Sequence, residues 1–176
     1  MVASNSSDRK RVGNAILGTA VFLALAPGFV AGIVPGLITG WEVRAHLPAP
    51  FRALGAVVCL VGIAFLLHAF ARFALEGLGT PAPVAPTKRL VVGGVYRFVR
   101  NPMYLAVLAV IGGQALFFGS AAVAGYGVLV ALAFILFVRT YEEPTLQATY
   151  GAEYETYCAE VPRWLPRPRR PRRQSS

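Results

Sequence analysis

Three long stretches without a charged residue dominate the pattern of the chain. Residues 12–41, 53–71 and 101–138 contain no Asp, Glu, Lys or Arg and are largely apolar. A helix needs about 20 predominantly apolar residues to cross the hydrocarbon core of a bilayer. The pattern therefore predicts an all-α integral membrane protein.

The third stretch is too long for a single crossing. Its 38 residues would form a helix of about 57 Å, whereas the hydrocarbon core is about 30 Å thick. We expect the stretch to fold back at residues 118–121, Phe-Gly-Ser-Ala, as a tight helical hairpin whose small residues allow close packing. Four spans are therefore expected, at about residues 15–37, 53–71, 103–118 and 122–138.

The first span contains Pro27 and Pro35, which are expected to kink the helix or end it early. Its charged start followed by an apolar run is similar to a signal peptide. Because further spans follow, we interpret it as an uncleaved first helix. We expect residues 1–166 to form a single membrane domain and residues 167–176 to form a disordered, basic tail rich in Pro and Arg.

The distribution of basic residues predicts the orientation of these spans. Of the 17 Lys and Arg residues, 15 lie before the first span, between the second and third spans, or after the fourth. Only Arg44 and Arg52 lie in the first loop. By the positive-inside rule, both termini and the segment from Arg72 to Asn101 are expected to be cytoplasmic.

The composition excludes several other classes of protein. Hydrophobic residues make up 56% and charged residues 14%, whereas a soluble domain carries about 25% charge, so a soluble globule and a disordered chain are both excluded. The net charge of +9 does not indicate nucleic-acid binding, because the basic residues border apolar blocks and form no basic face. Cys59 and Cys158 provide neither a disulfide framework nor the spacing of a metal site, and no metal is expected.

The second connection carries the first group of candidate functional residues. Residues 76–89, with three prolines and two glycines, are expected to form a turn or an extended linker, and residues 90–96 a short extended piece and a turn. Asn101 and Pro102 together are typical of a helix start. The free amides of that helix, flanked by Arg97 and Arg100, indicate a site for an anionic group such as a carboxylate or phosphate.

The end of the fourth span carries the second group. Thr140 and Glu143 have the spacing of a capping box, and with Pro144 they favour a chain reversal. Glu142 and Glu143 are adjacent carboxylates that could bind hydroxyls or an ammonium group. The tyrosines that follow, at positions 150, 154 and 157, have helical spacing and are expected to form one aromatic stripe, either in an adenine pocket or in the interfacial belt.

Together these segments resemble the integral-membrane methyltransferases of the isoprenylcysteine carboxyl methyltransferase and phospholipid methyltransferase group. The resemblance covers roughly residues 76–166. It rests on the ordered set of segments 93–104, 142–144, 150–154 and 161–166.

The resemblance implies an enzyme that takes S-adenosylmethionine from the cytosol and a lipophilic acceptor from the bilayer. It places Arg100, Asn101 and Arg163 at the catalytic centre. The expected cofactor-binding residues are Arg100, Asn101, Pro102, Tyr104, Glu142, Glu143 and Tyr154. Tyr154 and Arg163 would help to close the pocket. The Gly77-Leu78-Gly79 segment has the form of the Gly-x-Gly element of the phospholipid branch.

One departure affects the expected acceptor. The isoprenylcysteine enzymes have His where this chain has Asn101. The cytoplasmic segments of this chain contain no histidine near the expected centre. A carboxylate needs no base at neutral pH, whereas a protonated amine does. O-methylation of a prenyl-type carboxylate is therefore preferred over N-methylation of an aminophospholipid.

A non-catalytic membrane scaffold or a small transporter subunit is the alternative from another class. It would explain the four spans and the charge asymmetry. It would not explain the ordered arginines, glutamates and tyrosines. A transporter would also be expected to bury ionisable residues at mid-membrane, where only His68 is available, and we leave His68 out of the site.

Overall fold

The computed structural model describes residues 13, 17–18, 20–43, 47–77 and 90–166. All regular elements in these ranges are helical. In chain order they are η1 (Phe29–Ile33), α2 (Val34–Thr39), α3 (Ala49–Gly77), η2 (Gly94–Arg97), α4 (Pro102–Phe118), α5 (Ala121–Phe137), η3 (Val138–Glu142), α6 (Glu143–Tyr150) and α7 (Ala152–Glu160). The basic tail at 167–176 and the 78–89 part of the linker, with Leu78 and Gly79, lie outside the described residues.

Three helical runs are long and apolar enough to cross a membrane, namely Ala20–Thr39, Ala49–Phe73 and Ala121–Tyr150. The fourth, α4, is shorter, with 17 residues. Large apolar side chains of α3 and α5, such as Leu60 and Leu129, are mostly exposed in the isolated chain. Such surfaces are stable against lipid and costly in water, so the predicted all-α integral membrane fold is confirmed.

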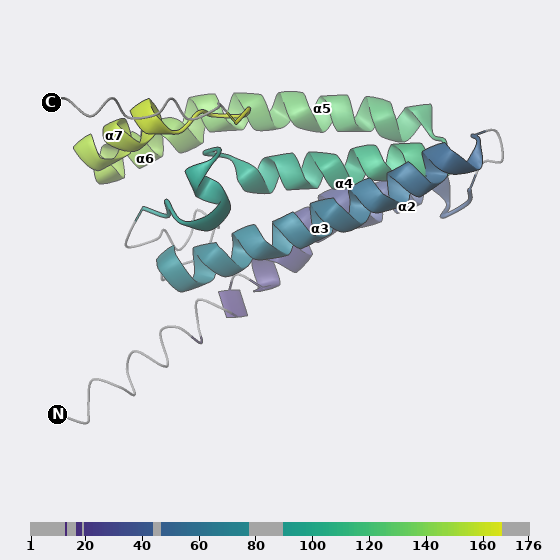
Figure 1. Ribbon diagram of the computed structural model, residues 1–176, viewed down its shortest axis with the longest axis horizontal. Coiled ribbons are helices and arrows are strands. Elements are labelled where there is room, and N and C mark those ends of the chain that lie inside the picture. The colour runs from purple at the N-terminus through teal and green to yellow at the C-terminus, as the bar shows by residue number, and fades with distance from the viewer. Residues whose placement is uncertain (1–12, 14–16, 19, 44–46, 78–89, 167–176) are drawn as a thin grey trace, which may run out of the picture.

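The helices form a bundle in which α4 lies between α3 and α5 (Figure 1). The loop before α3 and the turn between α4 and α5 lie at one end of the bundle. The short helix η2, together with α6 and α7, lies at the other end (Figure 1). The two segments that carry the candidate functional residues are thus brought to the same end.

The predicted hairpin between the third and fourth spans is present. Gly119 has a left-handed conformation, with φ of 65°, and ends α4. The hydroxyl of Ser120 then accepts a hydrogen bond from the Val123 amide and begins α5. Glycine permits this conformation because it has no Cβ, and serine is a favoured N-cap residue.

The chain reversal predicted at Thr140–Pro144 is wrong. The helical run continues from α5 through the π-helical segment η3 into α6, and the Thr140 hydroxyl donates a hydrogen bond to the Leu136 carbonyl within the same helix. A proline ring clashes with the carbonyl four residues earlier in an α-helix. For Pro144 that residue is Thr140, which lies inside the wider π-helical turn.

The first span shows the same arrangement. Pro27 and Pro35 do not end the helical run, which continues to Thr39 before Gly40 adopts a left-handed conformation. The π-helical segment η1 ends two residues before Pro35. Both spans therefore accommodate a proline by widening the turn that precedes it.

The second span is longer than expected. Helix α3 extends from Ala49 to Gly77, so the linker expected from residue 76 begins later. Beyond the undescribed residues, the chain returns as η2, where the sequence predicted a turn. Gly94 has φ of 55°, and a Cβ there would lie 3.0 Å from Nε2 of His68 and 2.8 Å from Nε of Arg72. Glycine is favoured at this position because other residues rarely adopt a positive φ, and the connection here lies against α3.

Glycines allow α3 and α4 to pack at close range. A Cβ on Gly113 would lie 2.7 Å from the Cys59 amide nitrogen and 2.8 Å from the Gly55 carbonyl oxygen. These are backbone atoms and cannot move away independently. The adjacent Gly112 is exposed, and a Cβ added to Gly112 would have no atom within 4 Å.

We expect Gly113→Ala to destabilise the bundle by about 1–3 kcal/mol because the new methyl group overpacks this contact. Gly112→Ala is the matched control. It should be neutral or slightly stabilising, since alanine favours a helix over glycine by about 1 kcal/mol. Thermal unfolding in detergent measures both, and equal melting temperatures for the two variants would contradict the close approach.

Candidate active site

The start of α4 is tied to the C-terminal segment of the chain. Asn101 occupies the N-cap position and Pro102 the first turn, as predicted. The Asn101 side chain makes no capping hydrogen bond, and its Nδ2 donates to the Arg163 carbonyl over 3.1 Å. The Arg100 amide donates to the Pro162 carbonyl over 2.9 Å. Residues 100–101 are thus joined to residues 162–163.

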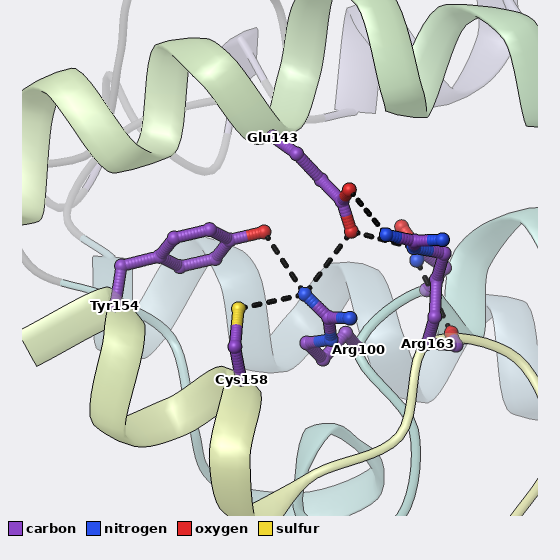
Figure 2. Close-up of polar contacts among 6 residues, drawn as sticks. Arg100, Glu143, Tyr154, Cys158 and Arg163 are labelled. Atoms are coloured by element: carbon purple, nitrogen blue, oxygen red, sulfur yellow. Dashed lines mark hydrogen bonds and ion pairs between the residues drawn. The ribbon is translucent and has the colours of Figure 1, made fainter.

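Arg100 lies at the centre of a polar cluster (Figure 2). Its Nη1 lies 3.0 Å from Oε1 of Glu143, 3.3 Å from the hydroxyl of Tyr154 and 2.7 Å from Sγ of Cys158. The side chain is only 12% exposed, and its buried Nε has no hydrogen-bond partner within the described part of the chain. A buried donor without a partner is costly, which distinguishes this atom from the paired Nη1.

Glu143 joins Arg100 to Arg163 (Figure 2). Nε and Nη2 of Arg163 donate to the two carboxylate oxygens of Glu143, each over 2.7 Å. The hydrogen bond to Glu143 raises the pKa of Arg163 above its ordinary value. Two guanidinium groups share one carboxylate, which leaves this group of three side chains with a net positive charge.

Helix α7 supplies the aromatic side of the cluster. Tyr154 and Tyr157 are buried and pack together with Val161. Burial raises the pKa of both phenols above the ordinary value, so both are neutral at physiological pH. The Tyr157 hydroxyl donates to the Tyr96 carbonyl over 2.7 Å and fixes α7 to η2.

The predicted stripe of three tyrosines on one helix is wrong. Gly151, with φ of 51°, separates α6 from α7, so Tyr150 ends one helix and Tyr154 lies on the next. Tyr150 nevertheless packs against the cluster that contains the other two tyrosines. It also lines the large cavity described below.

Glu142 has different partners from its neighbour Glu143. Its Oε2 accepts a hydrogen bond from the Tyr104 hydroxyl over 2.6 Å. The Tyr104 ring in turn lies against Phe134, with ring centroids 4.6 Å apart, and near Trp164, at 6.4 Å. Glu142 is therefore held by Tyr104 of α4.

The expected site residues line two neighbouring spaces. The first is a cavity of about 490 Å³. Five of the residues line it, namely Arg100, Asn101, Pro102, Tyr104 and Glu142. The other three, Glu143, Tyr154 and Arg163, line an adjoining open hollow of about 400 Å³. Arg100 lines both spaces.

The remainder of the cavity wall is largely apolar. The first helical run contributes Phe22, Ala26, Pro27 and Val30, and the other helices contribute residues that include Phe70, Val107, Phe134 and Phe137. The sequence did not single out these residues, because an apolar side chain that lines a cavity has the same pattern as one that faces lipid. Among the described residues, no group of three His, Cys, Asp or Glu side chains is placed to hold a metal ion.

Comparison with known proteins identifies the family. The phospholipid methyltransferase family matches residues 51–153, more than half of the chain. The match includes Arg100, Tyr104 and Glu142, and it ends just before Tyr154. No match was found among curated proteins. The resemblance noted from the sequence is confirmed, and this membrane protein belongs to the phospholipid methyltransferase family.

Proposed function

We propose that the protein transfers the methyl group of S-adenosylmethionine to a lipophilic acceptor that partitions into the bilayer. One observation carries the proposal, namely that a single cavity has charged groups, Arg100 and Glu142, on a wall that is otherwise largely apolar. Its volume of about 490 Å³ lies within the usual range for small-molecule sites, about 300–1,000 Å³. Polar groups for a cofactor and apolar walls for a lipid chain are thus combined in one space.

The residues present fit the cofactor. Arg100, which lines the cavity, and the amides at the start of α4 suit the carboxylate of the methionine part. Glu142 suits its ammonium group or the ribose hydroxyls. When bound, S-adenosylmethionine supplies an electrophilic methyl group on its sulfonium sulfur.

The chain's own contribution is to align the reactants and to exclude water. Arg100 and Glu142 orient the cofactor. The residues of the adjoining hollow act by holding Arg100. Glu143 and Tyr154 contact its guanidinium, and Arg163 contacts Glu143. By the positive-inside rule we expect this end of the bundle to lie on the cytoplasmic side, where the cofactor is available.

We favour a carboxylate as the acceptor. If Glu142 holds the cofactor, the described residues that line the cavity include no free carboxylate, histidine or lysine to act as a base. A carboxylate acceptor needs none at neutral pH. The second candidate, N-methylation of an aminophospholipid, is favoured by the position of Glu142, since that carboxylate could instead deprotonate an ammonium group.

Membranes incubated with methyl-labelled S-adenosylmethionine should distinguish these reactions. We expect label in a lipid that alkali releases as methanol, because methyl esters are labile to base and N-methyl groups are not. Alkali-stable label in phospholipid would replace the carboxylate by the amine. Absence of both cofactor binding and lipid labelling would favour the non-catalytic alternative.

A further inference from the structure

Pro35 removes a backbone hydrogen-bond donor from the middle of the first helical run. In an α-helix, the carbonyl of Ala31 would accept from the amide of residue 35, which proline lacks. The Val30 carbonyl is affected as well. Its α-helical partner, the Val34 amide, donates to Phe29, and its π-helical partner would again be residue 35.

Two side chains from other helices supply the missing donors. Nε2 of Gln114, on α4, donates to the Ala31 carbonyl over 2.5 Å. The hydroxyl of Tyr126, on α5, donates to the Val30 carbonyl over 2.9 Å. Carbonyl groups without partners cost several kcal/mol in a bilayer core. The two bonds therefore fix η1 against both arms of the α4–α5 hairpin.

The segment fixed in this way forms one wall of the large cavity. Val30 lines the cavity, and its carbonyl is held by Tyr126. Phe22, Ala26 and Pro27 lie within the eight residues before it and line the same cavity. Phe22 also stacks on Phe70 of α3, with ring centroids 6.2 Å apart. A shift of η1 would change the width of the cavity at this apolar wall.

We propose that Gln114 and Tyr126 are positioning residues that set the wall formed by the first helix and thereby determine which hydrocarbon chain the acceptor can carry. The inference rests on the proposed function, because it assigns this wall to the acceptor chain. Neither residue lines the cavity. Their effect is exerted through the backbone of residues 30 and 31.

The test uses the full-length protein in nanodiscs and three photoreactive prenylcysteines that differ only in prenyl chain length. Wild type is compared with Gln114→Leu, Tyr126→Phe and the double variant. Leu129→Ala is the control, because Leu129 lies on α5 near Tyr126 but is exposed. Peptide mapping measures crosslinking to residues 20–30, and titration measures the affinity for S-adenosylmethionine.

We expect wild type and Leu129→Ala to crosslink at the first helix with a clear preference for one chain length. In the double variant, the ratio of crosslinking with the preferred chain to crosslinking with the other chains should fall at least about fivefold. This change corresponds to about 1 kcal/mol, in the range of a membrane hydrogen bond. Its affinity for S-adenosylmethionine should stay within about twofold of wild type, which a merely structural defect would not allow.

Three results would overturn the inference: no crosslinking of wild type at residues 20–30, an unchanged preference in the double variant, or a parallel loss of cofactor affinity. Failure of the proposed function is separate. It would appear as wild-type protein that crosslinks the prenylcysteines but neither binds S-adenosylmethionine nor transfers its methyl group.

Discussion

Replacement of Arg100 by alanine is expected to weaken the binding of S-adenosylmethionine at least about 100-fold, or about 2.7 kcal/mol. Arg100 lines the cavity, so the variant lacks the proposed partner of the cofactor carboxylate. It also leaves the Glu143 carboxylate, which is partly buried, without one of its two arginines. Isothermal titration of the purified protein in detergent measures the loss.

Two further variants make this result specific. Arg97→Ala is the matched control, because Arg97 precedes the same helix start but is exposed; its affinity should equal that of wild type. Arg100→Lys keeps the charge but not the planar fork that contacts several partners, and an intermediate affinity is expected. Wild-type affinity of Arg100→Ala, or equal losses in Arg100→Ala and Arg97→Ala, would remove Arg100 from the cofactor site.

Glu142→Gln is expected to weaken cofactor binding by about 1–3 kcal/mol, or roughly 5–150-fold, the range for a hydrogen bond to a charged group. The amide has the shape of the carboxylate and still accepts a hydrogen bond from Tyr104, so the change removes charge without creating a void. Glu153→Gln is the matched control, because Glu153 is exposed on α7. The same titration compares the two variants.

The outcome for Glu142 also distinguishes its two proposed roles. Weaker binding of S-adenosylmethionine supports contact with the cofactor and therefore an acceptor that needs no base. Unchanged binding, combined with loss of methyl transfer to an aminophospholipid, would assign Glu142 as the base and favour N-methylation. Unchanged binding and unchanged transfer would exclude Glu142 from the site.

The membrane architecture followed from properties that are local in the sequence. The absence of charge over 38 residues required a fold-back, and Gly119 and Ser120 supplied the end of one helix and the start of the next. Asn101 and Pro102 marked the start of α4 for the same reason, because helix termini depend on a few adjacent residues. The family resemblance rested on the ordered set of segments 93–104, 142–144, 150–154 and 161–166.

The error at Pro144 has a physical cause that the sequence does not reveal. A proline normally indicates a helix boundary, but a π-helical turn can remove its clash with the carbonyl four residues earlier. Whether the carbonyls freed by such a proline are satisfied depends on side chains from other helices. At Pro35 these are Gln114 and Tyr126, which lie 83 and 96 residues from their acceptors.

The sequence by itself determined which residue types gather at one end of the bundle, and only the tertiary structure decided their partners. Glu142 and Glu143 are adjacent and chemically identical, so the sequence offered no basis for separating them. Adjacent residues on a helix project about 100° apart. One carboxylate therefore meets Tyr104 at the cavity, whereas the other meets Arg100 and Arg163 in the adjoining hollow.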